Sequence, residues 1–285
     1  MPCPFDKYLS AFCPWYRRHP RVSVIRMTGV IGRVGPMRGG MTLAGYAAVL
    51  ERAFAPKRLA AVALAINSPG GSPAQSSLLL GRIRALAEEK KVPVLAFIED
   101  VGASGGYWLA CAGDEIYANE NSIIGSIGVV SAGFGFQETI RRLGIERRLH
   151  TAGAQKAILD PFLEEQPAHV KRLTAIQKDM HETFKALVRA RRGDRLVGPE
   201  KEVFSGAFWV AGQARALGLI DGIGELRSVL RERFGDKTRF RVFEPRRPLL
   251  RRRLGLVGSG AGAGDWITDA IAAVEERGLW ARFGL

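Results

Sequence analysis

Residues 59–71 read LAAVALAINSPGG, and this stretch decides how the rest of the chain is interpreted. Its first eight residues are almost wholly apolar, and the apolar run stops abruptly at Asn67. A strand with both faces buried has this composition, and such strands are typical of parallel sheets covered by helices. The sequence therefore predicts an α/β fold with a buried strand over 59–66 that ends in a glycine-containing loop.

The segments that flank this stretch repeat the order of strand and helix. Residues 92–99, VPVLAFIE, predict a second buried strand, and residues 74–90 alternate apolar and charged positions as an amphipathic helix does. Upstream, residues 22–31 are rich in β-branched side chains and predict a strand, and residues 41–54 predict a helix. Repeated strand and helix units of this kind form a parallel sheet.

A third cycle and a helical region follow. We expect a short helix over 103–112, a strand over 115–118 and an extended segment over 123–130. We expect covering or assembly helices over 164–192, 209–217 and 225–234. In such sheets the chemistry lies just past the carboxyl ends of the strands, so the loops 67–72 and 101–106 are where we expect functional residues.

The length and composition allow one main domain with two appendages. The chain has 285 residues, 47% of them apolar, which is enough for a full hydrophobic core. We expect an N-terminal arm over 1–21, a main domain over 22–235 and a basic C-terminal tail over 236–285. The tail holds a glycine-rich linker over 258–264 and a short amphipathic segment over 266–280.

The formal net charge of +14 comes from scattered arginine clusters. Such a surface attracts anionic lipid head groups or nucleic acid. We expect no nucleic-acid partner, because the chain has no zinc-finger spacing and no aromatic-basic RNA-binding pattern. The tail's Arg251 to Arg253, with Trp266, Trp280 and Phe283, suggests peripheral attachment to an anionic membrane, although packing onto a neighbouring subunit accounts for the same residues.

The N-terminal sequence and the cysteines bear on location. The first twenty residues contain no apolar run of signal-peptide length, and no later window approaches eighteen uninterrupted apolar residues. Cys3, Cys13 and Cys111 have neither metal-ligand spacing nor an even count. We therefore expect a cytoplasmic protein without a metal site.

Ser104 is the candidate nucleophile. It stands in DVGASGGYW, residues 100–108, between a predicted strand and a predicted helix. Small residues on both sides let the chain turn sharply and hold a hydroxyl at the positive end of a helix, where developing negative charge is favoured. The segment does not match the G-x-S-x-G elbow of other hydrolases, and a serine among glycines is also a common turn or helix cap.

The loop 67–71 supplies a candidate oxyanion hole. Gly70 and Gly71 can turn backbone N–H groups toward a carbonyl oxygen, and the N–H of Gly105 could join them. A tight turn between strand and helix would need the same Pro-Gly-Gly sequence.

An activated serine needs a base, and histidine is the usual one. The chain has four histidines, His19, His150, His169 and His181. His19 lies in the arginine-rich arm, and the last two fall in the long charged helix, where they most simply face solvent. His150, beside a glycine-containing turn, is a plausible triad member.

Lys156 is the better candidate for the base. It lies in TAGAQKAILDPF, residues 151–162, which is uncharged apart from Lys156 itself and Asp160. A lysine acts as a base near neutral pH only where burial disfavours its ammonium form, and these small neighbours permit burial. Most lysines are surface charges, so local chemistry alone does not decide.

At this point the sequence resembles a known family, the signal peptide peptidase A (protease IV) family of Ser-Lys serine peptidases. The matching blocks are INSPGG at 66–71, ASGGYW at 103–108, SIIGSIGV at 122–129, GAQKA at 153–157, and FSG at 204–206 with ALGLID at 216–221. They occur in the family's order and cover roughly residues 22–234, so the resemblance implies that the main domain over 22–235 is a peptidase domain.

The resemblance implies roles for particular residues. Ser104 would be the nucleophile, Lys156 the general base, and Ser126 a hydroxyl that orients the lysine amine. The oxyanion hole would consist of Gly70, Gly71 and Gly105. No metal or cofactor is implied. Without the resemblance, Ser126 is also an ordinary turn residue at the end of a strand.

The resemblance also implies a fold and an assembly. The fold would be Clp protease/crotonase-like, with stacked ββα units and covering helices, in a homo-oligomeric ring that cleaves signal-peptide remnants or other extended apolar peptides. Many relatives carry a membrane anchor that is not seen here, and some carry two repeated halves. This chain has one copy of each motif, so we expect Ser104 and Lys156 to meet across a subunit interface.

Two other functions compete with a peptidase. A crotonase-like enzyme acting on an acyl-coenzyme A thioester needs a similar oxyanion hole, and it would use acidic residues such as Glu99 and Asp100 near the serine loop. An inactive, membrane-associated scaffold would use only the basic tail.

Overall fold

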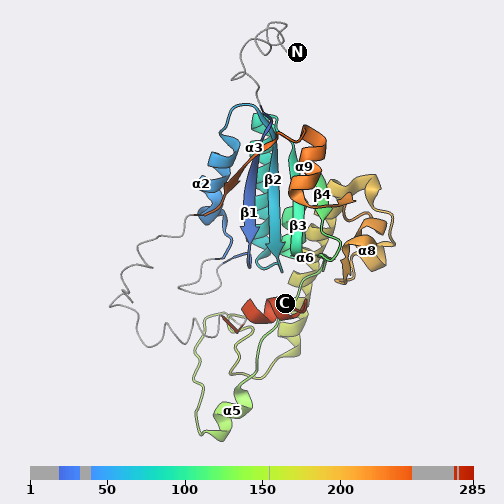
Figure 1. Ribbon diagram of the computed structural model, residues 1–285. Coiled ribbons are helices and arrows are strands. Elements are labelled where there is room, and N and C mark those ends of the chain that lie inside the picture. The colour runs from blue at the N-terminus through green and yellow to red at the C-terminus, as the bar shows by residue number, and fades with distance from the viewer. Residues whose placement is uncertain (1–18, 33–39, 154, 246–272, 275) are drawn as a thin grey trace, which may run out of the picture.

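One sheet with helices on both faces forms the centre of the molecule (Figure 1). The structure is a computed structural model that describes residues 19–32, 40–153, 155–245, 273–274 and 276–285. Within these residues the strands are β1 Arg21–Thr28, β2 Leu59–Ser68, β3 Val94–Ala103, β4 Glu115–Ala118, β5 Ile123–Gly125, β6 Phe208–Val210, β7 Gly222–Ile223 and β8 Arg239–Phe243.

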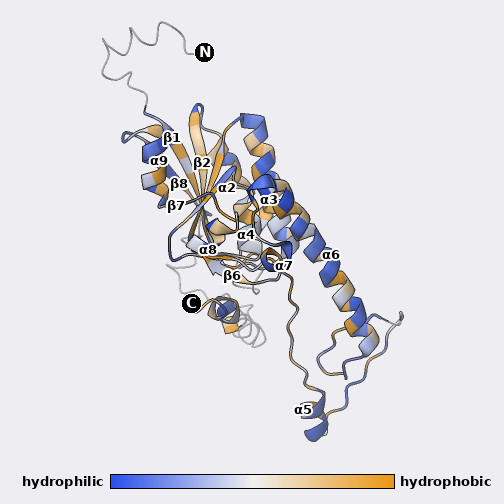
Figure 2. Ribbon diagram, turned by 90° about the vertical axis from the view of Figure 1, so that its right-hand side faces the viewer, coloured by the Kyte–Doolittle hydropathy of each residue, from blue (hydrophilic) through white to orange (hydrophobic). Residues whose placement is uncertain are grey.

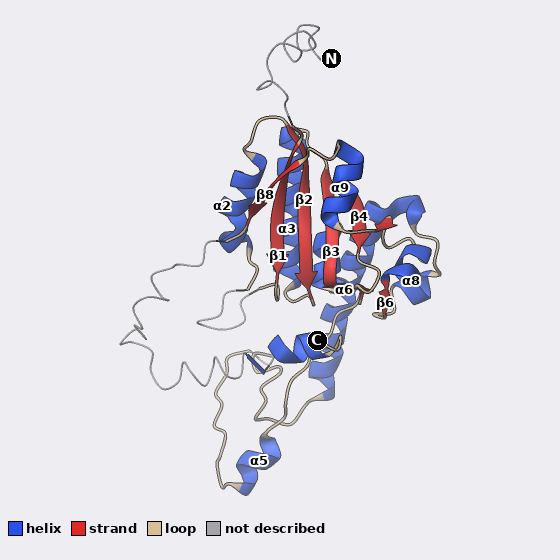
Figure 3. Cartoon of the chain, viewed as in Figure 1, coloured by secondary structure: helices blue, strands red, loops and turns tan. Residues whose placement is uncertain are grey.

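The helices include those that the sequence predicts, in the same order, and two short helices over 137–142 and 200–203 that it does not predict (Figure 3). Up to residue 245 the helices are α2 Leu43–Phe54, α3 Pro73–Lys90, α4 Gly105–Ala110, α5 Gln137–Arg142, α6 Pro167–Arg192, α7 Glu200–Val203, α8 Ala211–Ala216 and α9 Leu226–Phe234, with a 3₁₀ turn, η2, at Gly193–Arg195. The predicted α/β fold is therefore confirmed. Residues 209–217, expected as one helix, instead divide into β6 and α8, because β6 pairs with β5.

The sheet has the order β6-β5-β3-β2-β1-β8 and is parallel except between β5 and β6. The strand β3 pairs with β4 through residues 95–98 and with β5 through residues 101–103. The sheet therefore branches along β3, and the branch brings the ends of β3 and β5 next to each other. β8 pairs with β1, so residues 239–243 of the expected tail form an edge of the sheet. The division into arm, domain and tail otherwise stays a prediction.

The hydrophobic core lies on both faces of β2, as its apolar run predicts. Val62, Leu64 and Ile66 pack on the face covered by α2, α3 and α4. The alternate residues Ala61, Ala63 and Ala65 pack on the face covered by α9. The alternation follows from the two-residue period of a strand, and small alanines leave room for α9 to approach.

A long excursion leaves the sheet after β5. We name residues 128–166 the projecting arm; it contains α5 and returns to the sheet through α6 (Figure 2). At about 1.5 Å per residue, the 26 residues of α6 span about 39 Å. Only the later part of α6 is packed into the core, through Phe184 and Val188, so the arm extends away from the sheet.

Candidate active site

Ser104 occupies the turn between β3 and α4. Its backbone has φ 51° and ψ −120°, a conformation that side-chain-bearing residues rarely adopt. Its N–H donates to the Gly125 carbonyl at 2.8 Å, and its carbonyl accepts from the Trp108 backbone N–H at 3.0 Å. The Ser104 side chain makes no capping hydrogen bond and is half-buried, so its hydroxyl is not used as a helix cap.

Ser126 occupies the corresponding turn after β5. Ala103 pairs with Gly125 in the parallel register, so the two serines follow neighbouring strand ends. Ser126 also has φ 51°, its side chain is buried, and its N–H donates to the Ala207 carbonyl at 2.7 Å. The structure therefore brings Ser104 and Ser126 together, both in strained backbone conformations.

The loop after β2 closes the other side of Ser104. The Gly70 carbonyl accepts from Ile31 N–H and the Ser72 N–H donates to the Ile31 carbonyl, each at 2.8 Å. In a parallel bridge of this kind the N–H of the intervening residue, Gly71, points away from Ile31.

Glycine is required in this loop by close approach. A Cβ added at Gly70 would lie 2.8 Å from Ser104 Cβ and 2.9 Å from Gly105 N, and one added at Gly105 would lie 3.3 Å from Gly71 N. The N–H of Gly70 is already engaged, because it donates to Ser68 Oγ at 3.2 Å. The two N–H groups that can face a carbonyl beside Ser104 are therefore those of Gly71 and Gly105.

Lys156 lies on the projecting arm and is exposed. It lines a hollow of about 380 Å³ within the arm, together with Arg147, Thr151 and Phe162. Among the described residues, no hydrogen bond joins Lys156 to Ser104 or Ser126, and the arm extends away from the strand ends (Figure 1). One subunit therefore does not bring the predicted base to the predicted nucleophile.

Two of the histidines are less exposed than the sequence suggests, because His169 and His181 are both half-buried. His150 is exposed on the projecting arm, and nothing in the described structure joins it to Ser104. His181, which we expected to face solvent, is half-buried, and its Nε2 lies 3.0 Å from the Ile127 carbonyl oxygen. A possible signal was its position three residues before Phe184, on the side of α6 that turns toward the core.

A buried polar network supports the helix that follows Ser104. The Tyr107 hydroxyl, on α4, donates to the Leu219 carbonyl at 2.7 Å, and burial holds the pKa of Tyr107 well above its usual value. Nearby, both terminal nitrogens of Arg192 donate to Asp221 at 2.7 and 3.1 Å. Burial alone would raise the pKa of Asp221, but hydrogen bonds from Arg192 and from the Ile116 N–H hold it below its usual range.

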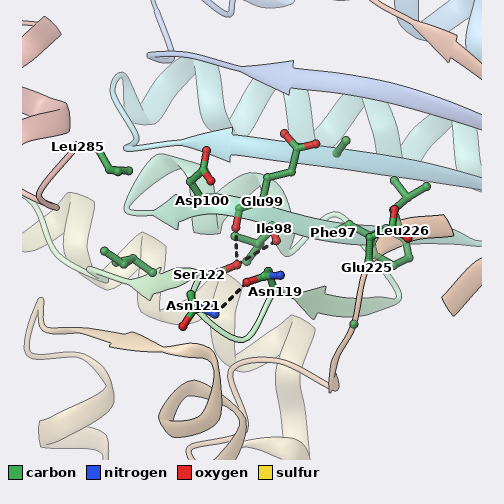
Figure 4. Close-up of a pocket in the computed structure, with 13 residues that line it drawn as sticks. Phe97, Ile98, Glu99, Asp100, Asn119, Asn121, Ser122, Glu225, Leu226 and Leu285 are labelled. Carbon is green, nitrogen blue, oxygen red and sulfur yellow. Dashed lines mark hydrogen bonds between the residues drawn. The ribbon is translucent and has the colours of Figure 1, made fainter. Parts of the chain in front are cut away.

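The acidic residues near the serine loop belong to a different pocket (Figure 4). Glu99 and Asp100 line a hollow of about 490 Å³ beside the start of α9, with Asn119, Asn121 and Leu226. Ser104 is not among the residues that line it. The geometry gives no support to acidic residues positioned over the Ser104 hydroxyl.

The remaining expectations concern metals, thiols and membranes. The described residues contain no cluster of side chains suited to a metal ion. Cys111 is buried, which raises the pKa of its thiol to about 12. Cys3, Cys13, Trp266 and the arginines 251–253 lie outside the described residues. None of the helices within the described ranges is long and apolar enough to cross a bilayer.

The closing residues of the chain pack onto the sheet near the site. Phe283 is buried against Val101 and Ala103 of β3, with Trp280 beside it. Phe283 also forms an edge-to-face contact with Phe208 at 5.3 Å. In this structure Phe283 is therefore held by the chain's own strands and is not free to enter a membrane.

The fold is shared with a known peptidase structure. The chain is similar to the solved structure of a mutant of the "1510-N membrane-bound stomatin-specific protease", with a TM-score of 0.50, 14% identity, and coverage of 80% of this chain and 100% of that one. The likeness at this identity concerns the fold alone, which is the Clp protease/crotonase-like class that the sequence predicts.

The sequence comparisons define the family. The model of peptidase family S49 matches residues 86–236, a range that includes Ser104, Ser126 and Lys156. The chain belongs to this family, in agreement with its resemblance to signal peptide peptidase A.

Two relatives are considerably longer than this chain. A Brucella abortus (strain 2308) protein named "Na(+)/H(+) antiporter NhaA" is 47% identical over 272 residues, which are 93% of this chain and 37% of that protein. The Arabidopsis thaliana protein named "Serine protease SPPA, chloroplastic" is 31% identical over 219 residues, 72% of this chain and 31% of the relative. The chain thus spans about a third of each.

Proposed function

We propose that the chain is a serine endopeptidase in which Ser104 attacks the peptide bond. The observation that carries the proposal is the Ser104 turn, which holds a hydroxyl without a capping role in a strained conformation beside the N–H groups of Gly71 and Gly105. Strain of this kind costs about 1–3 kcal/mol and is typical of active sites. Membership of peptidase family S49 supports the same reaction.

The general base of the proposal is Lys156 from a neighbouring subunit. Lys156 is exposed on an arm that extends beyond its own sheet, where a second copy of the chain could receive it. The arm and the first half of α6 also expose many large apolar side chains, which an assembly would bury. These are Val130, Phe134, Phe136, Leu143, Ile145, Leu149, Leu159, Phe162, Leu163, Val170, Ile176 and Met180.

The reaction would proceed by acyl transfer. The neutral amine of the partner subunit's Lys156 accepts the Ser104 proton while Ser104 Oγ bonds to the peptide carbonyl carbon. The N–H groups of Gly71 and Gly105 stabilise the oxyanion, and the C–N bond breaks as the ammonium group returns its proton to the leaving amine. Water then loses a proton to the lysine and attacks the ester carbon, the bond from that carbon to Ser104 Oγ breaks, and the ammonium group returns the proton to Oγ, which releases the acid and restores both residues.

Ser126 would orient the lysine amine. Its buried position one strand away from Ser104 is where an incoming amine could meet both hydroxyls. Gly70 would shape the hole without donating, because its N–H is bonded to Ser68. Extended apolar peptides, such as signal-peptide remnants, are the substrates we propose.

A mixing experiment tests the shared site. Ser104→Ala and Lys156→Ala are each expected to be inactive, and co-assembly of the two at equal amounts should restore activity at about a quarter of the sites, those with both intact partners. Covalent labelling with a fluorophosphonate, followed by intact mass, should modify the parent and not Ser104→Ala. A parent that is folded, assembled and unlabelled would contradict the peptidase, whereas labelling without complementation on mixing would contradict the shared site alone.

We also propose that the chain acts at an anionic membrane surface. The net charge of +14 supports this, and so does the similarity to a protein named as an antiporter. Because Phe283 packs on β3, the arginines 251–253 are better removed by substitution than by truncation. Replacing all three with alanine should weaken salt-sensitive binding to vesicles containing phosphatidylserine, and neutral vesicles serve as the control. Unchanged binding would exclude the tail as the anchor.

A further inference from the structure

His181 makes a hydrogen bond across a long distance in the sequence. Its Nε2 lies 3.0 Å from the carbonyl oxygen of Ile127, which is 54 positions away. A carbonyl oxygen only accepts, so the hydrogen is on Nε2 and His181 is the donor. The histidine is half-buried and Ile127 is fully buried, so water competes poorly for this bond.

The bond connects the residue just before the projecting arm to α6, the helix that follows the arm. Ile127 is the residue immediately before the arm and directly follows Ser126, whereas His181 lies on α6, the helix by which the chain returns. One turn further along α6, Phe184 packs on Trp108 with ring centroids 4.7 Å apart. Trp108 in turn donates its backbone N–H to the Ser104 carbonyl. α6 therefore contacts the segments that follow both serines. His181 binds the residue after Ser126, and Phe184 packs on α4, the helix that follows Ser104.

We propose that His181 is a positioning residue that fixes the arm carrying Lys156 relative to the Ser104 sheet. This inference rests on the proposed function of Lys156.

The geometry of α6 makes the position of the arm sensitive to this contact. His181 lies fourteen residues, or about 21 Å, from the start of α6 at Pro167, where the arm joins. A rotation of α6 by about 10° at His181 would displace that end by about 4 Å over this helix length. Misplacement of a catalytic group by about 1 Å can lower the rate about a hundredfold.

Matched substitutions separate this role from a structural one. His181→Phe keeps a ring and removes the donor, whereas His181→Gln keeps an N–H donor. His169→Phe is the control, because it makes the same change on the same helix at a ring without a hydrogen-bond partner among the described residues. We expect His181→Phe to lower kcat about tenfold with KM nearly unchanged, His181→Gln to recover most of the loss, and His169→Phe to match the parent.

A double variant tests whether His181 acts through Lys156. In the Lys156→Ala background, His181→Phe should cause no further loss in the residual rate of Ser104 labelling by a fluorophosphonate. An additional tenfold loss there, or parental kcat in His181→Phe, would overturn the inference. If His181→Phe does not fold, His181→Leu takes its place in the same comparison. Failure of the peptidase itself would be distinguished by an unlabelled parent, because all His181 measurements are ratios to a parent that labels.

Discussion

The turns after β3 and β5 differ sharply from the projecting arm. Ser104 and Ser126 are each fixed by backbone hydrogen bonds to another segment, and the residues around them are buried. Lys156 is exposed on the projecting arm, where the ion pair of Arg148 with Glu146 is exposed as well. The residues around the proposed nucleophile are thus fixed within one chain, whereas the proposed base would be fixed only by contact with a neighbouring subunit.

The largest expected effect tests whether both regions serve one reaction. Ser104→Ala and Lys156→Ala should each lower the rate of peptide hydrolysis by at least about a thousandfold, since members of a catalytic unit are individually indispensable. Their melting temperatures should match the parent's, because neither side chain packs in the core. Substantial activity in Lys156→Ala would mean that another residue is the base and that the projecting arm is not part of the active site.

A substitution at Gly70 tests whether the loop beside Ser104 must keep its position. Gly70→Ala would place a Cβ 2.8 Å from Ser104 Cβ at a φ of 109°, so the loop must move. We expect kcat/KM to fall about a hundredfold, the effect of losing one oxyanion-hole donor, because the shifted loop would misplace the neighbouring Gly71 N–H; some stability is lost as well.

Gly81→Ala on α3 is the control for Gly70→Ala, since a Cβ there meets nothing within 4 Å. It should leave activity unchanged and raise the free energy of unfolding by about 0.5–1 kcal/mol. Equal activity in the two variants would show that the loop beside Ser104 is not constrained.

A third prediction compares a buried ion pair with an exposed one by stability. Asp221→Asn leaves the buried Arg192 guanidinium without its counter-charge and should lower the free energy of unfolding by about 3–5 kcal/mol. Arg148→Ala on the arm should change it by less than about 0.5 kcal/mol. Urea denaturation measures both, and similar values would remove the distinction between the regions.

The Asp221 carboxylate also makes the stability of the protein depend on pH. Its pKa is lower in the folded protein than the unfolded value of about 3.9, so its contribution is complete above that value and is lost as pH falls through the folded pKa. Asp221→Asn should therefore lose less stability than the parent between about pH 5 and pH 2. An identical acid dependence would mean that Asp221 is not responsible.

The structure around Ser104 was largely predictable from the sequence, because it is determined by residues that are close together in the chain. The apolar run over 59–66 and the glycines at 70–71 specify a buried strand and a tight loop, and the small residues around Ser104 specify the sharp turn. The resemblance to signal peptide peptidase A added Ser126 and strengthened the choice of Lys156, and the roles of both stay predictions.

The projecting arm and the hydrogen bond that links α6 to the end of β5 were not predictable from local sequence patterns. The bond between His181 and Ile127 joins residues 54 positions apart, and hydrophobic period does not report such a contact. β6 was missed for the same reason, because the run Phe208–Val210 becomes a strand only by pairing with β5.

The positive φ of Ser104 and Ser126 lowers the stability of the folded chain. Glycine adopts this conformation freely, whereas for any other residue it costs about 1–3 kcal/mol. Ser104→Gly and Ser126→Gly should therefore each raise the melting temperature slightly. Stability alone favours glycine at both turns, so the two hydroxyls stand where the backbone conformation disfavours them.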